Sequence, residues 1–221
     1  MKVSTDSCLF GAWVAEKMQQ LKPDCRRILD IGTGTGLLSL MLAQKTAAQI
    51  NAVEIDPAAA QQATENGLAS PWKQRIHVQQ TDIKEYAPQH LYDLIISNPP
   101  FYEKSLLSPD AATNQARHSS DLTLEQLIQA ASNLLAEEGH FAVLLPYNRM
   151  DDFLETAANK GFSPMNSLLV SHSTQHAFSR TCVLLNRIAG SEKQPEELYI
   201  KEGNQYTGRF CGLLKDYYLY L

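Results

Sequence analysis

The sequence predicts an α/β protein with a doubly wound, mostly parallel sheet of seven strands and an antiparallel pair at one edge. Short runs rich in β-branched residues alternate with longer runs of helical spacing between residues 26 and 161, the pattern of strand–helix–strand units. The last two strand-like runs, 167–171 and 181–187, have no helix between them and so predict antiparallel neighbours. With 221 residues, 44% of them hydrophobic and 19% charged, the chain suits one globular domain.

The ends of the expected elements are marked by residues that cannot continue them. Three glycines, at 32, 34 and 36, end the first strand, and Asp56-Pro57 opens a helix as an N-cap followed by proline. Asn98-Pro99-Pro100 ends the fourth strand, because proline cannot donate to a sheet ladder. Gly139 and Gly161 close two later helices. The expected strands are 26–31, 50–55, 75–79, 92–97, 141–145, 167–171 and 181–187, and the main expected helices are 37–46, 57–68, 121–138 and 151–160.

Composition and charge exclude several classes of protein. The 19 basic and 24 acidic side chains give a net charge of −5, which excludes binding of nucleic acid through overall charge alone. The longest apolar stretch, 37–43, is far shorter than a membrane-spanning helix of roughly 20 residues, and the N-terminus has no signal-peptide pattern. The four cysteines form no C-x-x-C pair, and His172 and His176 have no evident third ligand. We therefore expect a cytoplasmic protein with reduced thiols, without a membrane anchor and without a metal.

A glycine-rich loop, Asp30-Ile31-Gly32-Thr33-Gly34-Thr35-Gly36, follows the first strand and opens a helix. Glycine lets the backbone turn tightly and approach a ligand closely. The spacing G-x-G-x-G differs from the G-x-G-x-x-G of dinucleotide sites, and Asp30 suits an ammonium group rather than a pyrophosphate. Glu54 ends the second strand, where its carboxylate can accept hydrogen bonds from both hydroxyls of a ribose. Asp82 follows the third strand, where it can meet an adenine amino group.

An ammonium group, a ribose diol and an adenine amine together describe S-adenosylmethionine (SAM). The simpler interpretation is an ordinary tight turn followed by a solvated strand end. However, Asp30, Glu54 and Asp82 come at successive strand ends, where doubly wound sheets bind their ligands. We therefore predict a SAM site that also includes Gly32 and Gly34.

The motif Asn98-Pro99-Pro100-Phe101 predicts a second, neighbouring site. The two prolines fix a rigid turn, so that the side-chain carbonyl of Asn98 and the backbone carbonyl of Pro99 are held as two acceptors. Two such acceptors can bind both hydrogens of a planar exocyclic amine, aim its lone pair at a methyl donor and stabilise the developing charge. Phe101 offers a face on which a planar substrate can stack. The alternative is a proline turn with a core phenylalanine; beside a methyl-donor loop we favour catalysis.

These motifs resemble those of class I methyltransferases, which have a Rossmann-like fold and act on amino nitrogens. A closer resemblance is to the bacterial tRNA(Val) adenine-N6 methyltransferase family. It is carried by the opening MKVSTDSCLFGAW, by DIGTGTGLLSLMLAQ, AVEIDPAAAQQATENGLASPW and DLIISNPPFY, and by the closing TGRFCGLLKDYYLYL. The resemblance weakens between about 162 and 197. It implies one methyltransferase domain, 1–221, with an N-terminal helical segment (1–24), a Rossmann-like core (25–190) and a C-terminal extension ending in a helix (191–221).

The resemblance also implies an activity: methylation by SAM of N6 of the adenine just 3′ of the anticodon in a valine tRNA. The partner would be the tRNA anticodon loop rather than DNA, and the protein is expected to be a monomer. Members usually carry an aromatic, basic segment ahead of the stretch matching Met1-Lys2-Val3. If that segment helps to cover SAM or RNA, a chain without it is expected to bind both weakly. By motif match, Asp30, Gly32, Gly34, Glu54 and Asp82 would hold SAM, and Asn98, Pro99, Pro100 and Phe101 would hold the target base.

Contacts to RNA are expected around the second site. An anticodon loop presents unstacked bases, so that flipping one out costs less than in a duplex. For each candidate side chain taken alone, a solvated surface position is the simpler interpretation, and binding should weaken with salt. The candidates are Tyr102, Lys104, Arg117, His118, Arg180, Arg187, Lys201 and Arg209.

Two other functions stay open at this point. The pattern N-P-P-[FY] also serves enzymes that methylate guanine N2 in ribosomal RNA or glutamine amides in release factors. Those enzymes usually add a recognition domain, for which 221 residues leave little room. A non-catalytic relative that binds RNA or a partner subunit is the second alternative. The joint presence of Asp30, Gly32, Glu54 and Asn98 favours an enzyme.

Overall fold

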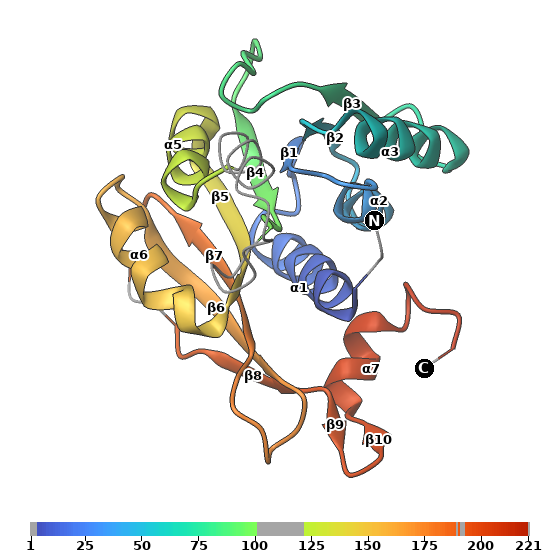
Figure 1. Ribbon diagram of the computed structural model, residues 1–221, viewed down its shortest axis with the longest axis vertical. Helices are drawn as coiled ribbons and strands as arrows, with labels where there is room; N and C mark the ends of the chain where they lie inside the picture. The colour runs from blue at the N-terminus through green and yellow to red at the C-terminus, as the bar shows by residue number, and fades with distance from the viewer. Residues whose placement is uncertain (1–3, 101–121, 189, 191–192, 221) are drawn as a thin grey trace, which may run out of the picture.

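The computed structural model describes residues 4–100, 122–188, 190 and 193–220 (Figure 1). Its helices and strands alternate along most of the chain, and a 3-10 turn at Tyr147–Arg149 joins β5 to α6. The helices are α1 (Thr5–Leu21), α2 (Leu37–Lys45), α3 (Pro57–Ala69), α5 (Leu124–Leu134), α6 (Met150–Ala158) and α7 (Gly208–Leu214). The strands are β1 (Arg27–Ile31), β2 (Gln49–Glu54), β3 (Ile76–Gln80), β4 (Tyr92–Ser97), β5 (Leu135–Pro146), β6 (Ser163–Ser171), β7 (Arg180–Asn186), β8 (Glu196–Tyr199), β9 (Lys201–Glu202) and β10 (Gln205–Tyr206).

The main sheet has the strand order β3-β2-β1-β4-β5-β7-β6-β8. From β1 the chain winds outward through β2 and β3, then returns to β4 on the other side of β1 and winds outward again. The switch point of the sheet therefore lies between β1 and β4, which is where doubly wound folds bind ligands. Only β7 runs antiparallel to its neighbours in this sheet. The predicted doubly wound, mostly parallel architecture is confirmed.

The sheet contains eight strands, one more than the sequence predicts. β8 pairs in parallel with β6 and forms the edge, so that the antiparallel pair β6–β7 lies inside the sheet rather than at its edge. This strand escapes sequence analysis because it has four residues, Glu196-Glu197-Leu198-Tyr199, of which only Leu198 is buried. Its polar composition resembles that of a loop. The last element of the C-terminal extension is the helix α7, and residues 215–220, which follow it, are not helical.

One expected boundary is also corrected. The helix predicted to reach residue 138 ends at Leu134, and β5 begins at Leu135. Leu135 pairs with Tyr92 of β4 and is buried, which extends the strand backwards. Gly139 does not end a helix: a Cβ there would lie 2.8 Å from the Leu135 side chain and 2.9 Å from the Tyr92 carbonyl oxygen. The glycine is needed for close approach within the sheet.

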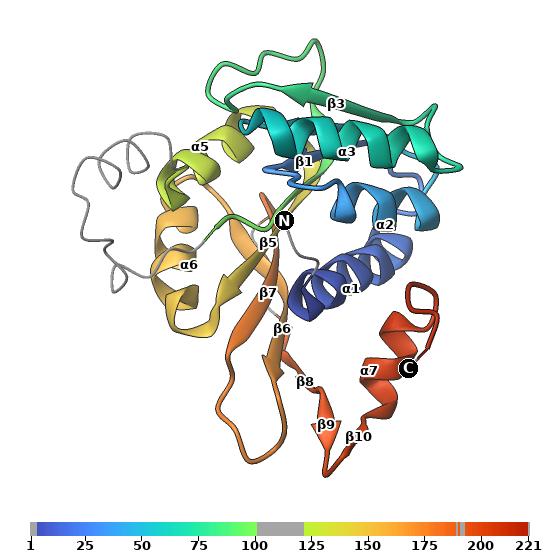
Figure 2. The same cartoon turned by 45° about the vertical axis from the view of Figure 1, so that its right-hand side comes forward.

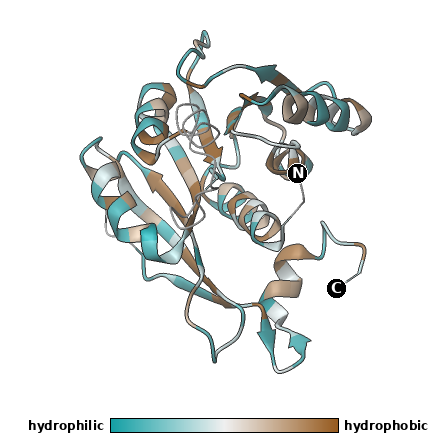
Figure 3. Ribbon diagram, viewed as in Figure 1, coloured by the Kyte–Doolittle hydropathy of each residue, from teal (hydrophilic) through white to brown (hydrophobic). Residues whose placement is uncertain are grey.

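Helices cover both faces of the sheet, and consecutive strand residues point alternately to the two faces. Ile28 packs with α1, α2 and α7 on one face, whereas its neighbour Leu29 packs with α5 and α6 on the other (Figure 2). The same alternation runs through the buried parts of β4, β5 and β7, which are apolar on both faces, while the β9–β10 hairpin is hydrophilic (Figure 3). Within the described ranges, no helix combines the length and apolar character needed to cross a membrane.

Candidate active site

The glycine loop turns the chain sharply between β1 and α2. Gly32 and Gly34 have φ of 70° and 58°, in the left-handed region that glycine tolerates best. The Gly32 N–H donates to the Val53 carbonyl oxygen at 2.8 Å, which holds the loop against β2. A Cβ at Gly32 would meet no atom within 4 Å in the part of the chain that is described. The backbone here faces open space, so a ligand can approach it closely.

Asp30 holds this loop from inside. Its side chain is fully buried, and Oδ2 accepts hydrogen bonds from Thr33 Oγ1 at 2.6 Å and from Ser39 Oγ at 2.8 Å and N at 3.2 Å. Oδ1 has no hydrogen-bond partner among the described residues. Burial raises the pKa of the Asp30 carboxyl to about 6, against the lowering effect of the bonds from Thr33 and Ser39, and the charge of Glu54 raises it further. One oxygen thus fixes the loop, and the other is a buried acceptor.

Glu54, the last residue of β2, is the second buried carboxylate at this edge. Its Oε2 accepts from the Gly34 N–H at 2.8 Å, and its Oε1 accepts from the Asp56 N–H at 3.0 Å. These bonds orient the carboxylate between the glycine loop and the start of α3. Each carboxylate oxygen has two acceptor positions, so both oxygens can still accept from a diol.

Asp82 follows β3 at the same edge and is more exposed. Its Oδ1 accepts from the Lys84 N–H at 2.9 Å, and its Oδ2 lies 3.0 Å from Lys84 Nζ. Partial burial raises the pKa of the Asp82 carboxyl, but the hydrogen bonds and charge of Lys84 outweigh this, and the net pKa is below its usual value. Asp82 is therefore an ionised acceptor that an adenine amine would share with a lysine.

Asn98 lies directly beyond β4, next to the glycine loop. The hydroxyl of Ser97 donates to the Ile31 carbonyl oxygen at 2.8 Å and fastens the end of β4 to β1. Asn98 Nδ2 donates to Ser7 Oγ of α1 at 2.9 Å, and Ser7 Oγ lies 2.8 Å from Oγ of Ser4, the N-cap of that helix. Because the amide nitrogen faces Ser7, Oδ1 points away from α1. Pro99 is buried and Pro100 exposed, and Phe101 lies outside the described residues.

Three neighbouring strands therefore carry the central candidates: Asp30 on β1, Glu54 on β2 and Asn98 after β4. Two buried carboxylates without a cationic partner in the described chain suit a positively charged ligand. This set of acceptors, with the open glycine loop, fits the ammonium and ribose groups of SAM. Sequence reasoning missed Ser7: the spacing of Ser4 and Ser7 before an apolar run predicts a helix start, but not the contact to β4.

The expected RNA contacts are spread over the molecule. Arg180 begins β7 at the carboxyl edge and pairs with Asp6 at 3.1 Å, whereas Arg187 lies past the other end of β7, at the opposite edge, and donates to the Ser132 carbonyl oxygen. Lys201 lies over the Tyr206 ring at 5.4 Å. Arg209 is held in an ion-pair network with α1 and β8. Tyr102, Lys104, Arg117 and His118 lie outside the described residues.

Comparison with known sequences identifies the domain. Residues 12–160 match the family described as "Methyltransferase small domain". A "tRNA1(Val) (adenine(37)-N6)-methyltransferase" from Parabacteroides distasonis is 39% identical over 99% of this chain and 91% of that protein. A protein of the same name from Serratia proteamaculans is 40% identical over 100% of this chain and 84% of its own.

Solved structures share the fold at low sequence identity. A predicted O-methyltransferase from Agrobacterium tumefaciens superposes with a TM-score of 0.70 and 18% identity, covering 95% of each chain. The glycopeptide N-methyltransferase MtfA, solved in complex with SAM, gives a TM-score of 0.56 and 11% identity over 81% of this chain and 88% of its own. Such identities establish the fold alone.

Proposed function

The chain belongs to the tRNA1(Val) (adenine(37)-N6)-methyltransferase family and contains its methyltransferase small domain, and from this we propose that it methylates N6 of adenine 37 in tRNA1(Val), using SAM. The protein is thus a SAM-dependent enzyme that acts on tRNA. The observation that carries the proposal is the amide of Asn98, which is fixed beside the glycine loop with its oxygen directed away from α1.

On the donor side, the chain offers acceptors for the ammonium group, the ribose hydroxyls and the adenine amine of SAM, which supplies a reactive methyl group on a sulfonium. Asp30 Oδ1, which has no partner among the described residues, would accept from the ammonium group, and the Glu54 carboxylate would accept from the ribose hydroxyls. Asp82 would accept from the adenine amine. Gly32 and Gly34 allow close approach of the loop. Both buried carboxylates also favour the positive charge of the donor.

On the acceptor side, Asn98 Oδ1 and the Pro99 carbonyl oxygen would accept the two N–H groups of the target amine. Two fixed acceptors favour a pyramidal nitrogen, whose lone pair then points at the methyl group, and they stabilise the charge that develops during transfer. A strong base is not required, because nitrogen loses its proton after the N–C bond has formed. Ser7 acts as a positioning residue, since its hydroxyl accepts the hydrogen bond from Asn98 Nδ2. Pro100 would stiffen the turn, and Phe101 would stack on the base.

The finer features of the partner and setting are also part of the proposal. We infer that the enzyme acts on the anticodon loop, where adenine 37 is unpaired and is flipped out at low cost. Its activity needs no metal, because charge stabilisation by Asn98 and Pro99 suffices for methyl transfer to an amine. It works as a monomer in the cytoplasm, where tRNA is modified.

Methyl transfer from isotopically labelled SAM tests this function. The substrates are unmodified total tRNA and, separately, ribosomal RNA, each digested to nucleosides and identified by mass. Label in N6-methyladenosine from tRNA, abolished when adenine 37 of a tRNA1(Val) transcript is replaced by guanine, is the expected result. Label in N2-methylguanosine or only in protein would agree with methyl transfer to an amine nitrogen, but would contradict adenine 37 of tRNA1(Val) as the substrate.

A further inference from the structure

Three aromatic side chains, Tyr147, Phe178 and Tyr199, form a row that the donor and acceptor sites do not use. The ring centroids of Tyr147 and Phe178 are 5.6 Å apart, and those of Phe178 and Tyr199 are 6.0 Å apart. The rings are tilted by 52° and 31° relative to one another, and Phe178 and Tyr199 are half-buried. Tyr147 is 41% exposed. We call these three residues the aromatic row.

The aromatic row lies at the catalytic edge of the sheet. Ser97 pairs with Val143, and β5 runs on to Pro146, so Tyr147 follows the strand next to Asn98. β7 is antiparallel to β5, and its first residue, Arg180, pairs with Pro146, which brings Phe178 to the same edge. β8 ends there with Tyr199, paired with Ser171. The row therefore crosses the edge from β5 to β8, starting one strand from Asn98.

Backbone contacts hold the aromatic row in place. The Tyr147 N–H donates to the Ser179 carbonyl oxygen at 3.1 Å, which links the end of β5 to the start of β7. In the turn between β6 and β7, the Ser171 hydroxyl is within hydrogen-bond distance of the carbonyl oxygens of Ser173 at 2.9 Å and His176 at 2.8 Å. This turn carries Phe178. The backbone that carries Tyr147 and Phe178 is thus fixed in advance of binding, which lowers the entropic cost of ligand capture.

The charges beside the aromatic row are mixed. Arg149 lies 3.7 Å from Asp152, Arg180 is paired with Asp6, and the Tyr199 hydroxyl donates to Glu197 at 2.7 Å. Such a surface does not gather phosphates by net charge, in keeping with the overall charge of −5. Aromatic faces bind unpaired bases by stacking, which needs no net positive charge.

We propose that the aromatic row is a stacking site for the unpaired nucleotides that flank the target adenine. The proposal rests on the proposed function, because it extends the base site beside Asn98 along the same edge. Phe178 and Tyr147 lie nearest the base site and receive the adjacent nucleotide, and Tyr199 extends the surface. This contact would supply affinity for a single-stranded loop that the charges around it do not.

Binding of a fluorescently labelled, unmodified anticodon stem-loop RNA, measured by anisotropy, tests the aromatic row. Tyr147→Leu and Phe178→Leu keep apolar volume but remove the ring, and each is expected to raise the Kd for RNA about tenfold. Tyr147→Phe keeps the ring and should bind like wild type. Leu91→Ala is the matched control, because Leu91 is 50% exposed at the amino end of β4, on the opposite edge.

The outcomes separate this proposal from the proposed function. A raised Kd for both leucine variants, with SAM affinity and the Kd of Leu91→Ala unchanged, supports the stacking site. An unchanged Kd for both leucine variants overturns it, even if the wild-type enzyme methylates adenine 37. Loss of RNA binding by Tyr147→Phe as well would also overturn it, since that variant keeps the stacking face. Failure of the wild type to form N6-methyladenosine would instead refute the function, because the binding assay does not depend on transfer.

Discussion

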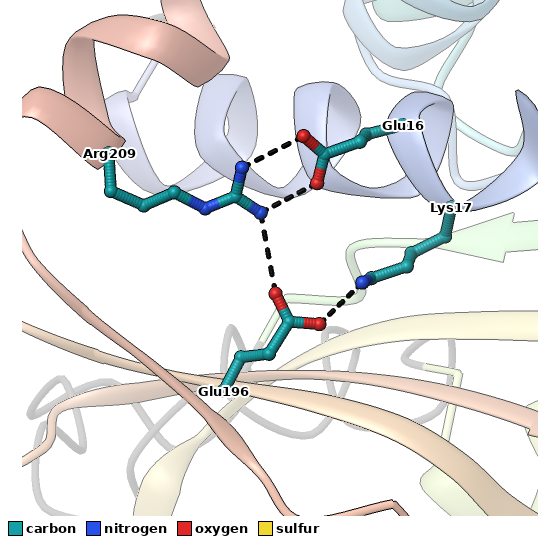
Figure 4. Close-up of polar contacts among 4 residues, drawn as sticks. All are labelled: Glu16, Lys17, Glu196 and Arg209. Carbon is teal, nitrogen blue, oxygen red and sulfur yellow. Dashed lines mark hydrogen bonds and ion pairs between the residues drawn. The ribbon is translucent and has the colours of Figure 1, made fainter. Parts of the chain in front are cut away.

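Two clusters of carboxylates in this molecule have opposite surroundings. In the first, which we call the clasp, Glu16 and Lys17 of α1 meet Glu196 of β8 and Arg209 of α7 (Figure 4). Arg209 binds both oxygens of Glu16 at 2.6 and 2.8 Å, and Lys17 Nζ lies 2.5 Å from Glu196 Oε1. In the second cluster, at the catalytic edge, Asp30 and Glu54 accept only neutral N–H and O–H donors within the described residues.

The pKa values reflect this difference. The hydrogen bond from Arg209 holds the pKa of Glu16 below its usual value, whereas burial raises that of Asp30 to about 6. Because the pKa of Asp30 is higher in the folded protein than its unfolded value of 3.8, Asp30 contributes most to the free energy of unfolding at low pH. This contribution is lost as the pH rises through about 6. Ionised Asp30 thus costs about 3 kcal/mol of stability at neutral pH. The ion pairs of the clasp stabilise the fold, whereas the buried carboxylates of the catalytic edge destabilise it and favour the binding of a positively charged ligand.

The largest expected effect is at Asn98. Asn98→Ala removes one of the two acceptors for the target amine, and the rate of transfer should fall about 100- to 1,000-fold. Binding of SAM, measured by calorimetry, should be nearly unchanged, because Asn98 belongs to the acceptor side. Equal losses in transfer and in donor binding would refute this division of labour.

Glu54→Ala should act on the donor instead. Loss of hydrogen bonds to a charged acceptor is expected to weaken SAM binding about 10- to 100-fold. Raising the SAM concentration should restore much of the transfer rate, in contrast to Asn98→Ala. An unchanged Kd for SAM in a calorimetric titration would count against the ribose role of Glu54.

A smaller effect is expected at Ser7, whose hydroxyl contacts Asn98 and Ser4, the N-cap of α1. Ser7→Ala removes the acceptor that orients the amide, worth about 1 kcal/mol, so kcat should fall about fivefold with the Kd for SAM unchanged. Ser7→Thr keeps the hydroxyl and should restore the rate. If Ser7→Ala lowered the melting temperature but not kcat, Ser7 would be a helix residue without a role in positioning.

The smallest effect on activity is expected in the clasp. Arg209→Ala breaks a partly exposed network and should lower the free energy of unfolding by about 1 kcal/mol or less, seen in urea unfolding. The Kd for SAM and the transfer rate should match those of the wild type. A loss of SAM binding in this variant would show that the two clusters are not independent.

The sequence predicted those features that depend on local pattern. Strand ends placed Asp30, Glu54 and Asn98 at one edge, because parallel strands share their carboxyl side. It did not predict contacts between distant segments, such as that between Ser7 and Asn98, which are 91 residues apart. It also missed β8, because these residues are recognisable as a strand only from their pairing with β6. It missed the aromatic row as well, because its members become neighbours only through the antiparallel direction of β7.

The most direct test of this account compares Asp30→Asn with Glu196→Gln, which remove one negative charge from each cluster. Thermal unfolding and calorimetric titration with SAM are measured for both at pH 8 and pH 5. Asp30→Asn keeps an acceptor for Thr33 and Ser39, so it should raise the melting temperature at pH 8, by less at pH 5, and weaken SAM binding about tenfold. Glu196→Gln should lower the melting temperature and leave SAM binding unchanged. An Asp30→Asn variant that is less stable at pH 8 yet binds SAM like wild type would contradict the account.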